Sequence, residues 1–169
     1  MKRCIGVATV VLAGGIAVGC EARQPLAPDV TGPLFAAATT TPITATATLM
    51  LAEPGETRTS DGIIHIRDQV QTGTVSGTGG LNGSVRVVGR SDVEMATGTG
   101  TGSGKFTIMV TGGTWEGSFE GRFDGGVFSG KLVAQGTGAL AGKLLRGSIS
   151  QRAPNRIYFL TGTILTTGS

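Results

Sequence analysis

Residues 114–123 read Thr-Trp-Glu-Gly-Ser-Phe-Glu-Gly-Arg-Phe and carry the clearest structural signal in the chain. In an extended strand, alternate side chains point to the same face. One face then carries aromatic rings separated by glycines, namely Trp115, Gly117, Phe119, Gly121 and Phe123. The interior of a small barrel is too narrow for a large side chain at every position, and glycine permits the bends that close a sheet. The stretch therefore predicts one strand of a small, curved β-barrel.

The same period of two runs through the chain from residue 43 onward. Residues 43–51 alternate apolar side chains with threonine, as a half-buried strand does. Further strands are expected at 63–68, 70–78, 83–92, 104–111, 114–123, 127–136, 141–150 and 156–165, and two of these candidates can form one bent strand. Regular short strands with frequent glycine predict an all-β fold, an antiparallel β-barrel of about eight strands.

Turn residues separate these strand candidates. Residues 82–83 are Asn-Gly and residues 124–126 are Asp-Gly-Gly, and both predict hairpin turns. Residues 53–56 and 59–62 combine Pro, Gly, Ser and Asp, which is typical of turns or loops. Residues 97–104 alternate Thr or Ser with Gly, and we expect a flexible loop there rather than the end of a strand.

The composition excludes several classes of protein. Of the 169 residues, 30 are glycine and only 15% are charged, against a usual charged fraction of roughly 25%. Glycine and threonine are poor helix formers, which argues against a helical bundle. The hydrophobic fraction of 39% is enough for a small core. No apolar run is long enough to span a bilayer as a helix.

The first twenty residues have the form of a targeting signal. The pair Lys2-Arg3 precedes an uncharged run over residues 5–18, and residues 16–20 read Ile-Ala-Val-Gly-Cys. This end resembles the lipobox of bacterial lipoproteins, although Ala stands three positions before the cysteine, where Leu is usual. The resemblance implies cleavage before Cys20 and a diacylglycerol on its thiol. The alternatives are an ordinary secretory signal and an uncleaved anchor.

Cleavage at this place divides the chain into three parts: a signal peptide over 1–19, a lipidated tether over 20–42 and a barrel over 43–169. The tether is rich in proline and has no apolar period. Removing 1–19 leaves 12 basic against 11 acidic residues, so the formal net charge falls from +3 to +1. No basic cluster remains to bind nucleic acid. The lipid anchor makes the membrane the expected partner, and Glu21 after the cysteine implies the outer membrane in a cell that has one.

A second resemblance rests on glycine spacing. The segments are Gly112–Gly121, Gly136-Thr-Gly-Ala-Leu-Ala-Gly142 and Leu145-Arg-Gly147. They look like uncharacterised secreted bacterial proteins, which in turn are similar to the barrel of allene oxide cyclases and plant dirigent proteins. The resemblance implies an eight-stranded, calycin-like barrel with an apolar lumen, and it carries over no catalytic residue. Barrels of these families often assemble, so an oligomer is compatible with the sequence.

Few side chains can support chemistry. His65 is the only histidine, and it shares a strand face with Arg67, opposite Ile64 and Ile66. Pointing inward, His65 and Arg67 would bind an anionic head group, or His65 would act as a base. Pointing outward, they would face solvent while the two isoleucines fill the core. A single histidine without a thiol in the domain gives no metal site, and no cofactor is expected.

These observations favour a non-catalytic envelope lipoprotein whose barrel binds a hydrophobic small molecule or has a structural role. No catalytic residue is assigned. The alternative is a cyclase- or isomerase-like enzyme that holds a hydrophobic substrate in one conformation. The candidate ligand-binding residues are His65, Arg67, Trp115, Phe119 and Tyr158. If the anchor is absent, the protein is expected to be secreted.

Overall fold

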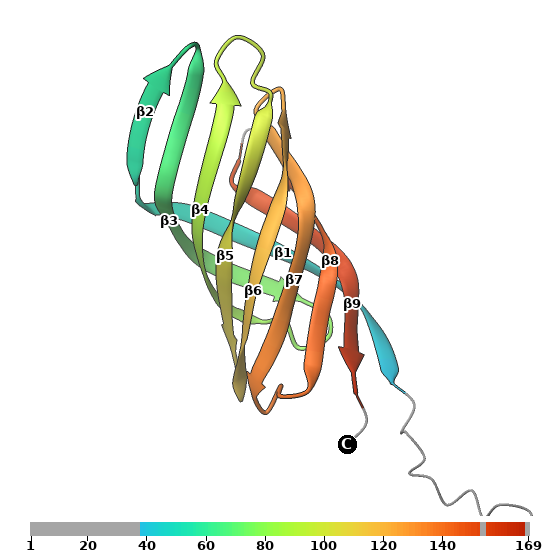
Figure 1. Cartoon of the computed structure of the whole chain (residues 1–169). Helices are drawn as coiled ribbons and strands as arrows, with labels where there is room; N and C mark the ends of the chain where they lie inside the picture. The colour runs from blue at the N-terminus through green and yellow to red at the C-terminus, as the bar shows by residue number, and fades with distance from the viewer. Residues whose placement is uncertain (1–37, 153–154, 168–169) are drawn as a thin grey trace, which may run out of the picture. The chain divides into compact units, whose positions relative to one another are not determined.

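The computed structural model describes residues 38–152 and 155–167 of the chain (Figure 1). The signal, the lipobox with Cys20 and most of the expected tether lie outside these residues. The described part forms nine strands and no helix. The strands are β1 (Thr39–Glu53), β2 (Glu56–Ser60), β3 (Ile63–Gly77), β4 (Gly83–Glu94), β5 (Gly100–Val110), β6 (Gly113–Asp124), β7 (Val127–Gly138), β8 (Lys143–Arg152) and β9 (Ile157–Thr166).

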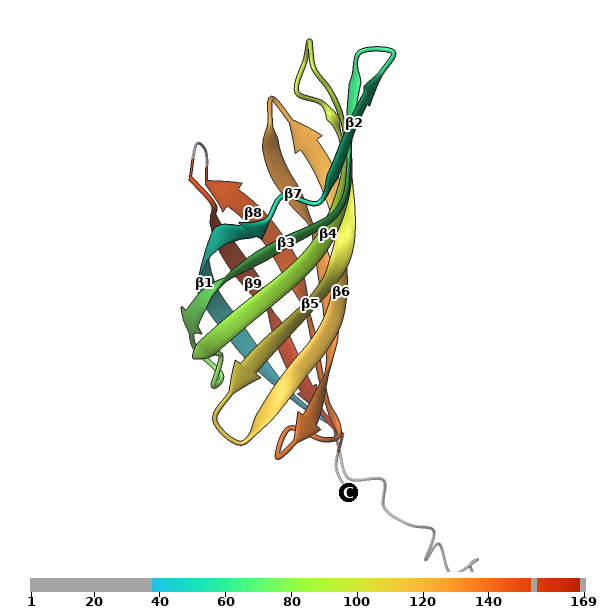
Figure 2. The same cartoon turned by 90° about the vertical axis from the view of Figure 1, so that its left-hand side faces the viewer.

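Eight of these strands close into an antiparallel barrel, as predicted. Strands β3 to β9 pair consecutively, β9 pairs with β1, and β1 pairs with β3 to complete the ring. The remaining strand, β2, pairs only with β3, outside the closed ring. Figures 1 and 2 show the strongly tilted strands that this closure requires.

The barrel has two different ends. The turns at 77–83, 110–113 and 138–143 lie at one end, together with the start of β1 and the finish of β9, where Thr39 pairs with Thr166. We call this the closed end. The turns at 60–63, 94–100, 124–127 and 152–157 lie at the other, which we call the open end. There the β2–β3 hairpin extends beyond β1 (Figure 2).

Strand β3 is a single bent strand that changes partner along its length. Its first half, Ile63 to Arg67, pairs with β2, and its second half pairs with β1. Between these halves lies a β-bulge, because Ile66 pairs with Ser91 but Gln69 pairs with Gly89. Asp68 in the bulge has φ 54°. The two strands predicted at 63–68 and 70–78 are therefore one strand with an inserted residue.

Two expected loops are partly strands. Residues 56–60 form β2, although turn or loop structure was expected on both sides of them, because β3 extends past the end of β1 and presents a free edge. Strand β5 begins at Gly100, inside the loop expected at 97–104. Here glycine is needed because aromatic rings occupy the interior. A Cβ on Gly102 would lie 2.8 Å from Cε2 of Phe123.

Strand β1 begins at Thr39, four residues before the predicted strand, and it includes Pro42. Proline has no backbone N–H and is tolerated only where that edge of the strand is unpaired. Pro42 pairs with Thr163 on β9, whereas the pairing of β1 with β3 begins only at Ala45. The other edge of β1 is therefore free at Pro42.

The turn between β3 and β4 is longer than the predicted Asn-Gly hairpin. Residues 78–82 form a loop in which Gly79 and Gly80 have positive φ values of 66° and 80°. The Asn82 side chain accepts a hydrogen bond from the Gly77 N–H and donates one to the Gly77 carbonyl oxygen, each 3.1 Å long. The loop turns Leu81 into the barrel, where it is fully buried. The turn at 124–126 does follow the prediction, with φ 55° at Gly125 and 80° at Gly126.

The interior at the closed end is filled by apolar side chains. The largest fully buried ones are Trp115, Leu81 and Leu145. No polar or charged side chain is fully buried in the described part of the chain. The alternation predicted for 114–123 is confirmed, since a Cβ on Gly117 would lie 2.6 Å from Cβ of Ala134, across the strand pair. Glycine at that position, between the inward-facing Trp115 and Phe119, lets β6 pack closely against Ala134 of β7.

Candidate functional site

A cavity of about 110 Å³ lies inside the barrel, between the packed closed end and the open end. Its wall is mainly apolar and comes from every strand of the closed ring. Five aromatic side chains line it: Phe106, Phe119, Phe123, Phe128 and Tyr158. At the open end Ile66 and Ser91 also contribute to the wall. The fold leaves this interior space unfilled.

The aromatic wall is held in place by mutual packing and by glycines beneath the rings. Phe119 and Phe128 meet edge to face, with ring centroids 5.8 Å apart and planes at 89°. Phe123 packs against Phe128 at 5.2 Å. A Cβ on Gly104 would lie 2.8 Å from Cε1 of Phe119, and one on Gly121 would lie 2.7 Å from Cζ of Phe128. These rings therefore need glycine at the neighbouring positions.

Polar groups gather on one side of the cavity. The Gln71 side-chain nitrogen donates a hydrogen bond of 2.8 Å to the Gln69 side-chain oxygen, and both residues line the cavity. Tyr158 lies on β9, opposite Ala47 of β1. Burial raises the pKa of the Tyr158 hydroxyl, and the positive charge of Arg156 partly opposes this rise. The hydroxyl is thus neutral at physiological pH.

Three of the predicted ligand-binding residues lie on the interior face. Phe119 and Tyr158 line the cavity. Trp115 instead packs in the closed end, opposite Ile108, with 1% of its surface exposed. Its indole Nε1 has no hydrogen-bond partner among the described residues. Trp115 therefore supports the floor of the interior rather than the cavity wall.

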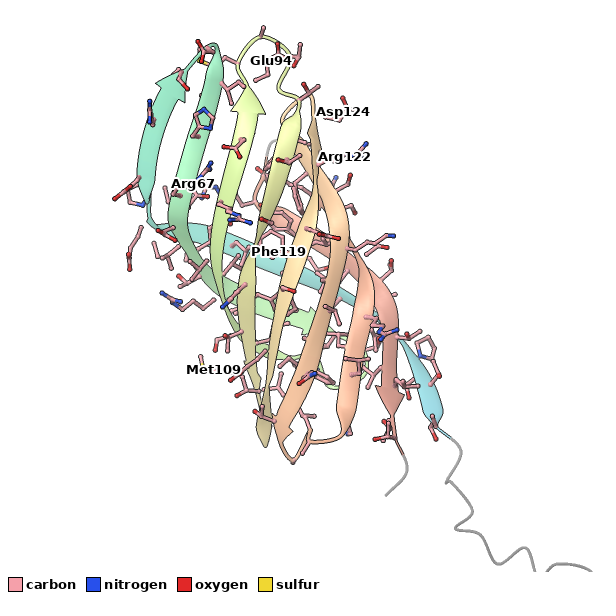
Figure 3. The ribbon with its side chains drawn as sticks, in the orientation of Figure 1. Arg67, Glu94, Met109, Phe119, Arg122 and Asp124 are labelled. Atoms are coloured by element: carbon pink, nitrogen blue, oxygen red, sulfur yellow. The ribbon has the colours of Figure 1, made fainter. Side chains whose placement is uncertain are left out.

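His65 and Arg67 lie on the outer face of β3. Ile66 between them lines the interior cavity, and alternate side chains of a strand point to opposite sides. Of the two orientations open from the sequence, the outward one is present, and Figure 3 shows Arg67 on the part of β3 near the open end. These two side chains are therefore not part of the cavity wall.

On the outer face, His65 and Arg67 form a cluster with Asp92 and Ser60. Asp92 Oδ1 lies 2.6 Å from Nδ1 of His65 and 2.7 Å from Nη2 of Arg67. On its other side, His65 Nε2 lies 3.1 Å from the Ser60 hydroxyl oxygen. Hydrogen bonds from Arg67 and then from His65 lower the pKa of the Asp92 carboxyl group. The cluster links β2, β3 and β4.

The order of contacts from Ser60 through His65 to Asp92 is that of a nucleophile, a base and an orienting carboxylate. Two observations favour a structural role instead. Arg67 contacts the same Asp92 oxygen as His65 does, so this carboxylate does not serve the imidazole alone. Arg67 Nη1 also donates to the carbonyl oxygens of Ile66 and Ser91, at 2.8 and 3.0 Å, where the bulge interrupts the strand ladder. We therefore assign the cluster as a clamp on the bulge and on β2.

Sequence reasoning missed several residues of these two sites. Gln69 and Gln71 line the cavity because the bulge shifts β3 by one residue and turns its odd-numbered positions inward. The only signal in the sequence was the break between the strands predicted at 63–68 and 70–78. The place of Asp92 opposite His65 depends on the β3–β4 register, which no local pattern shows. Ser60 joins the cluster only because residues 56–60 form a strand.

The described residues contain no group of three or more His, Cys, Asp or Glu side chains that could hold a metal ion. None of them forms a helix long and apolar enough to cross a membrane. No protein-family model, curated protein or solved structure matches the chain.

Proposed function

We propose that this protein is a cell-envelope lipoprotein, anchored through Cys20, whose barrel holds a small hydrophobic molecule without transforming it. The anchor is supported by the lipobox-like sequence over residues 16–20. The chain enters the barrel at the closed end, at Thr39. The open end, where a ligand can enter, therefore lies opposite the point at which the chain enters the barrel.

The observation that supports binding is the apolar cavity of about 110 Å³ with five aromatic side chains in its wall. Ligand sites are typically apolar cavities with a few convergent polar groups, and here Gln69, Gln71 and Tyr158 supply those groups. An apolar cavity of ~150 Å³ holds a benzene molecule. This cavity is smaller, at about 110 Å³, and therefore suits a short alkyl chain or part of a ring, with the rest of a larger ligand projecting through the open end.

The resemblance of the glycine spacing to that of allene oxide cyclases and dirigent proteins is the basis of the alternative, an enzyme that cyclises or isomerises a hydrophobic substrate by holding its conformation. The closed barrel and its apolar interior are compatible with it. A histidine or carboxylate facing the ligand would favour it, but His65 lies on the outer face and Asp92 bonds to it there. We therefore prefer binding without turnover.

A cavity-filling substitution tests the binding proposal. Gly89 lines the cavity, and an added Cβ there would meet only ordinary contacts, 3.6 Å from Cζ of Phe119 and 3.7 Å from the Ser103 carbonyl oxygen. Gly89→Leu is therefore expected to fill the space without straining the backbone. The matched control is Val88→Leu, on the opposite face of the same strand.

The measurement is ligand-observed NMR with toluene and with 1-hexanol, alongside native mass spectrometry of protein purified gently from its source cells. We expect the wild type and Val88→Leu to bind a probe and Gly89→Leu to bind neither. A co-purifying mass lost on organic extraction would identify the natural ligand. Absence of binding in the wild type, or equal binding in all three proteins, would leave the barrel with a structural role.

A further inference from the structure

We propose that the ligand is a small monocarboxylate, with its apolar part in the cavity and its carboxylate bound by Arg156 at the open end. This inference rests on the proposed function, since it assumes that the cavity holds a ligand. It adds the charge and the chemical class of that ligand, together with the residue that recognises it.

Strand pairing places Arg156 beside the cavity. The N–H of Leu49 donates a hydrogen bond of 2.9 Å to the Arg156 carbonyl oxygen. The neighbouring residues Thr48 and Ile157 are paired with each other between β1 and β9. Arg156 therefore stands opposite Leu49, a residue that lines the cavity. Tyr158 follows two positions later, on the same face of the strand, and also lines the cavity.

The electrostatics of Tyr158 agree with this placement. The positive charge of Arg156 lowers the pKa of Tyr158 against the effect of burial, so the guanidinium lies within electrostatic range of the hydroxyl. Gln69 and Gln71, also on the cavity wall, add amide groups. The cavity wall thus includes one cation, Arg90, and several neutral hydrogen-bonding groups, and Arg156 adds a second cation at the open end near Tyr158.

One nitrogen of the Arg156 guanidinium lacks a hydrogen-bond acceptor. Its Nη1 atom is buried and has no hydrogen-bond partner among the described residues. Both salt bridges found among the described residues involve Asp92, on the outer face of the barrel, and neither involves Arg156. A buried N–H group of a charged side chain without an acceptor is costly, so a bound acceptor would be strongly favoured there.

The chemistry of that acceptor follows from the site. Guanidinium binds planar carboxylates through two parallel hydrogen bonds. The Arg156 guanidinium balances one negative charge, and the small apolar cavity accommodates only a short chain or part of a ring. Short alkyl and simple aromatic carboxylates share this chemistry. They are distinguished by using both in the same test.

The test compares each acid with its neutral amide: phenylacetate with phenylacetamide, and hexanoate with hexanamide. Binding to the purified full chain is measured by calorimetry at neutral pH. A charge-assisted pair at this site is expected to favour each bound acid over its amide by about tenfold or more. The acid that binds more tightly, alkyl or aromatic, identifies the type of tail.

Arg156→Gln should remove the preference for the acid, so that each acid and its amide bind with similar affinity. Arg156→Lys keeps the charge but not the planar fork, and should keep part of the preference. The matched control is Arg152→Gln, an exposed arginine at the end of β8 and near the same end of the barrel. It should behave as the wild type. Fluorescence of Trp115, the only tryptophan, reports whether each variant is folded.

A second readout is the ultraviolet titration of Tyr158, the only tyrosine. A carboxylate bound beside it should raise its pKa, whereas the amide should have a smaller effect. Equal binding of acid and amide, in the wild type and in Arg156→Gln, would overturn this inference and leave the proposed function intact. If neither acid nor amide binds the wild type but toluene or 1-hexanol does, this inference fails and the proposed function stands; if none of these probes binds, both fail.

Discussion

Single side chains set the chemistry of this barrel, because so few of them are ionisable and close to the interior. Tyr158 lines the cavity, and burial raises its pKa above the ordinary value of 10.0. The neutral hydroxyl that burial selects can donate a hydrogen bond to a ligand but cannot repel an anion. Arg156 opposes this shift through its charge, so the two residues are electrically coupled.

We predict that the absorbance change of tyrosinate formation at 295 nm has its midpoint above pH 10.0. Because the folded pKa is raised, the stability that Tyr158 contributes is fully present below pH 10.0 and is lost as the pH rises through the folded pKa. Arg156→Gln should move the midpoint higher still, since it removes a positive charge. A midpoint at or below 10.0 in the folded wild type would contradict the burial of Tyr158.

At the scale of elements, the bulge in β3 separates the outer cluster from the inner cavity. Without the bulge, positions 69 and 71 would share a face with His65 and point outward. With it, the two glutamines reach the interior while Arg67 caps the interrupted ladder from outside. The clamp of Ser60, His65, Arg67 and Asp92 holds β2, which has no partner other than β3.

We predict that Asp92→Asn loosens this clamp. Because the folded pKa of Asp92 is lowered, its contribution to stability is present above the ordinary value of 3.8 and is lost as the pH falls through the folded pKa. The cluster is partly exposed, so the loss at neutral pH should be modest, about 0.5–1 kcal/mol. Hydrogen exchange should show faster opening of β2 amides, with the rest of the barrel unchanged.

The control for this prediction is Glu120→Gln, an exposed acidic residue on the outer face of β6. It should leave the exchange of β2 amides as in the wild type. Denaturation between pH 2 and 7 should show a shallower acid dependence for Asp92→Asn than for the wild type. Identical pH dependence of the two proteins would mean that the carboxylate does not stabilise the clamp.

At the scale of the whole molecule, the barrel is packed at one end and hollow toward the other. Leu81 enters from the loop at 78–82 and meets Trp115 and Leu145 in the same apolar core. These side chains fill the interior at the closed end, and the cavity lies beyond them toward the open end. Residues such as Phe106 and Leu132 belong both to the core and to the cavity wall.

We predict that Leu81→Ala destabilises the protein by about 2–5 kcal/mol, because it removes a fully buried side chain and leaves a cavity. The measurement is unfolding in guanidinium chloride followed by Trp115 fluorescence. Leu51→Ala is the matched control, because Leu51 is 43% exposed. It should change the free energy of unfolding by less than about 0.5 kcal/mol. Equal effects of the two substitutions would contradict a packed floor at the closed end.

Local patterns in the sequence were sufficient for the fold class and for much of the strand layout. The aromatic–glycine alternation over 114–123, the turn at 124–126 and the period of two all act between near neighbours, and each was confirmed. The same reasoning misjudged residues 97–104, whose glycines belong partly to β5 because rings from β6 and β7 fill the space above them. Its contribution to the candidate site was smaller, limited to Phe119 and Tyr158 on the wall.

Residue placements that depend on pairing between distant strands could not be predicted from the sequence. The periodicity of a strand defines two faces but does not say which one a bulge will turn inward, and so Gln69 and Gln71 were missed. Asp92 meets His65 across 27 positions of sequence, through the β3–β4 register. Arg156 stands beside the cavity because closure brings β9 against β1. The alternation of side chains along a strand depends only on neighbouring residues, whereas the register and the closure of the barrel depend on how all its strands pack together.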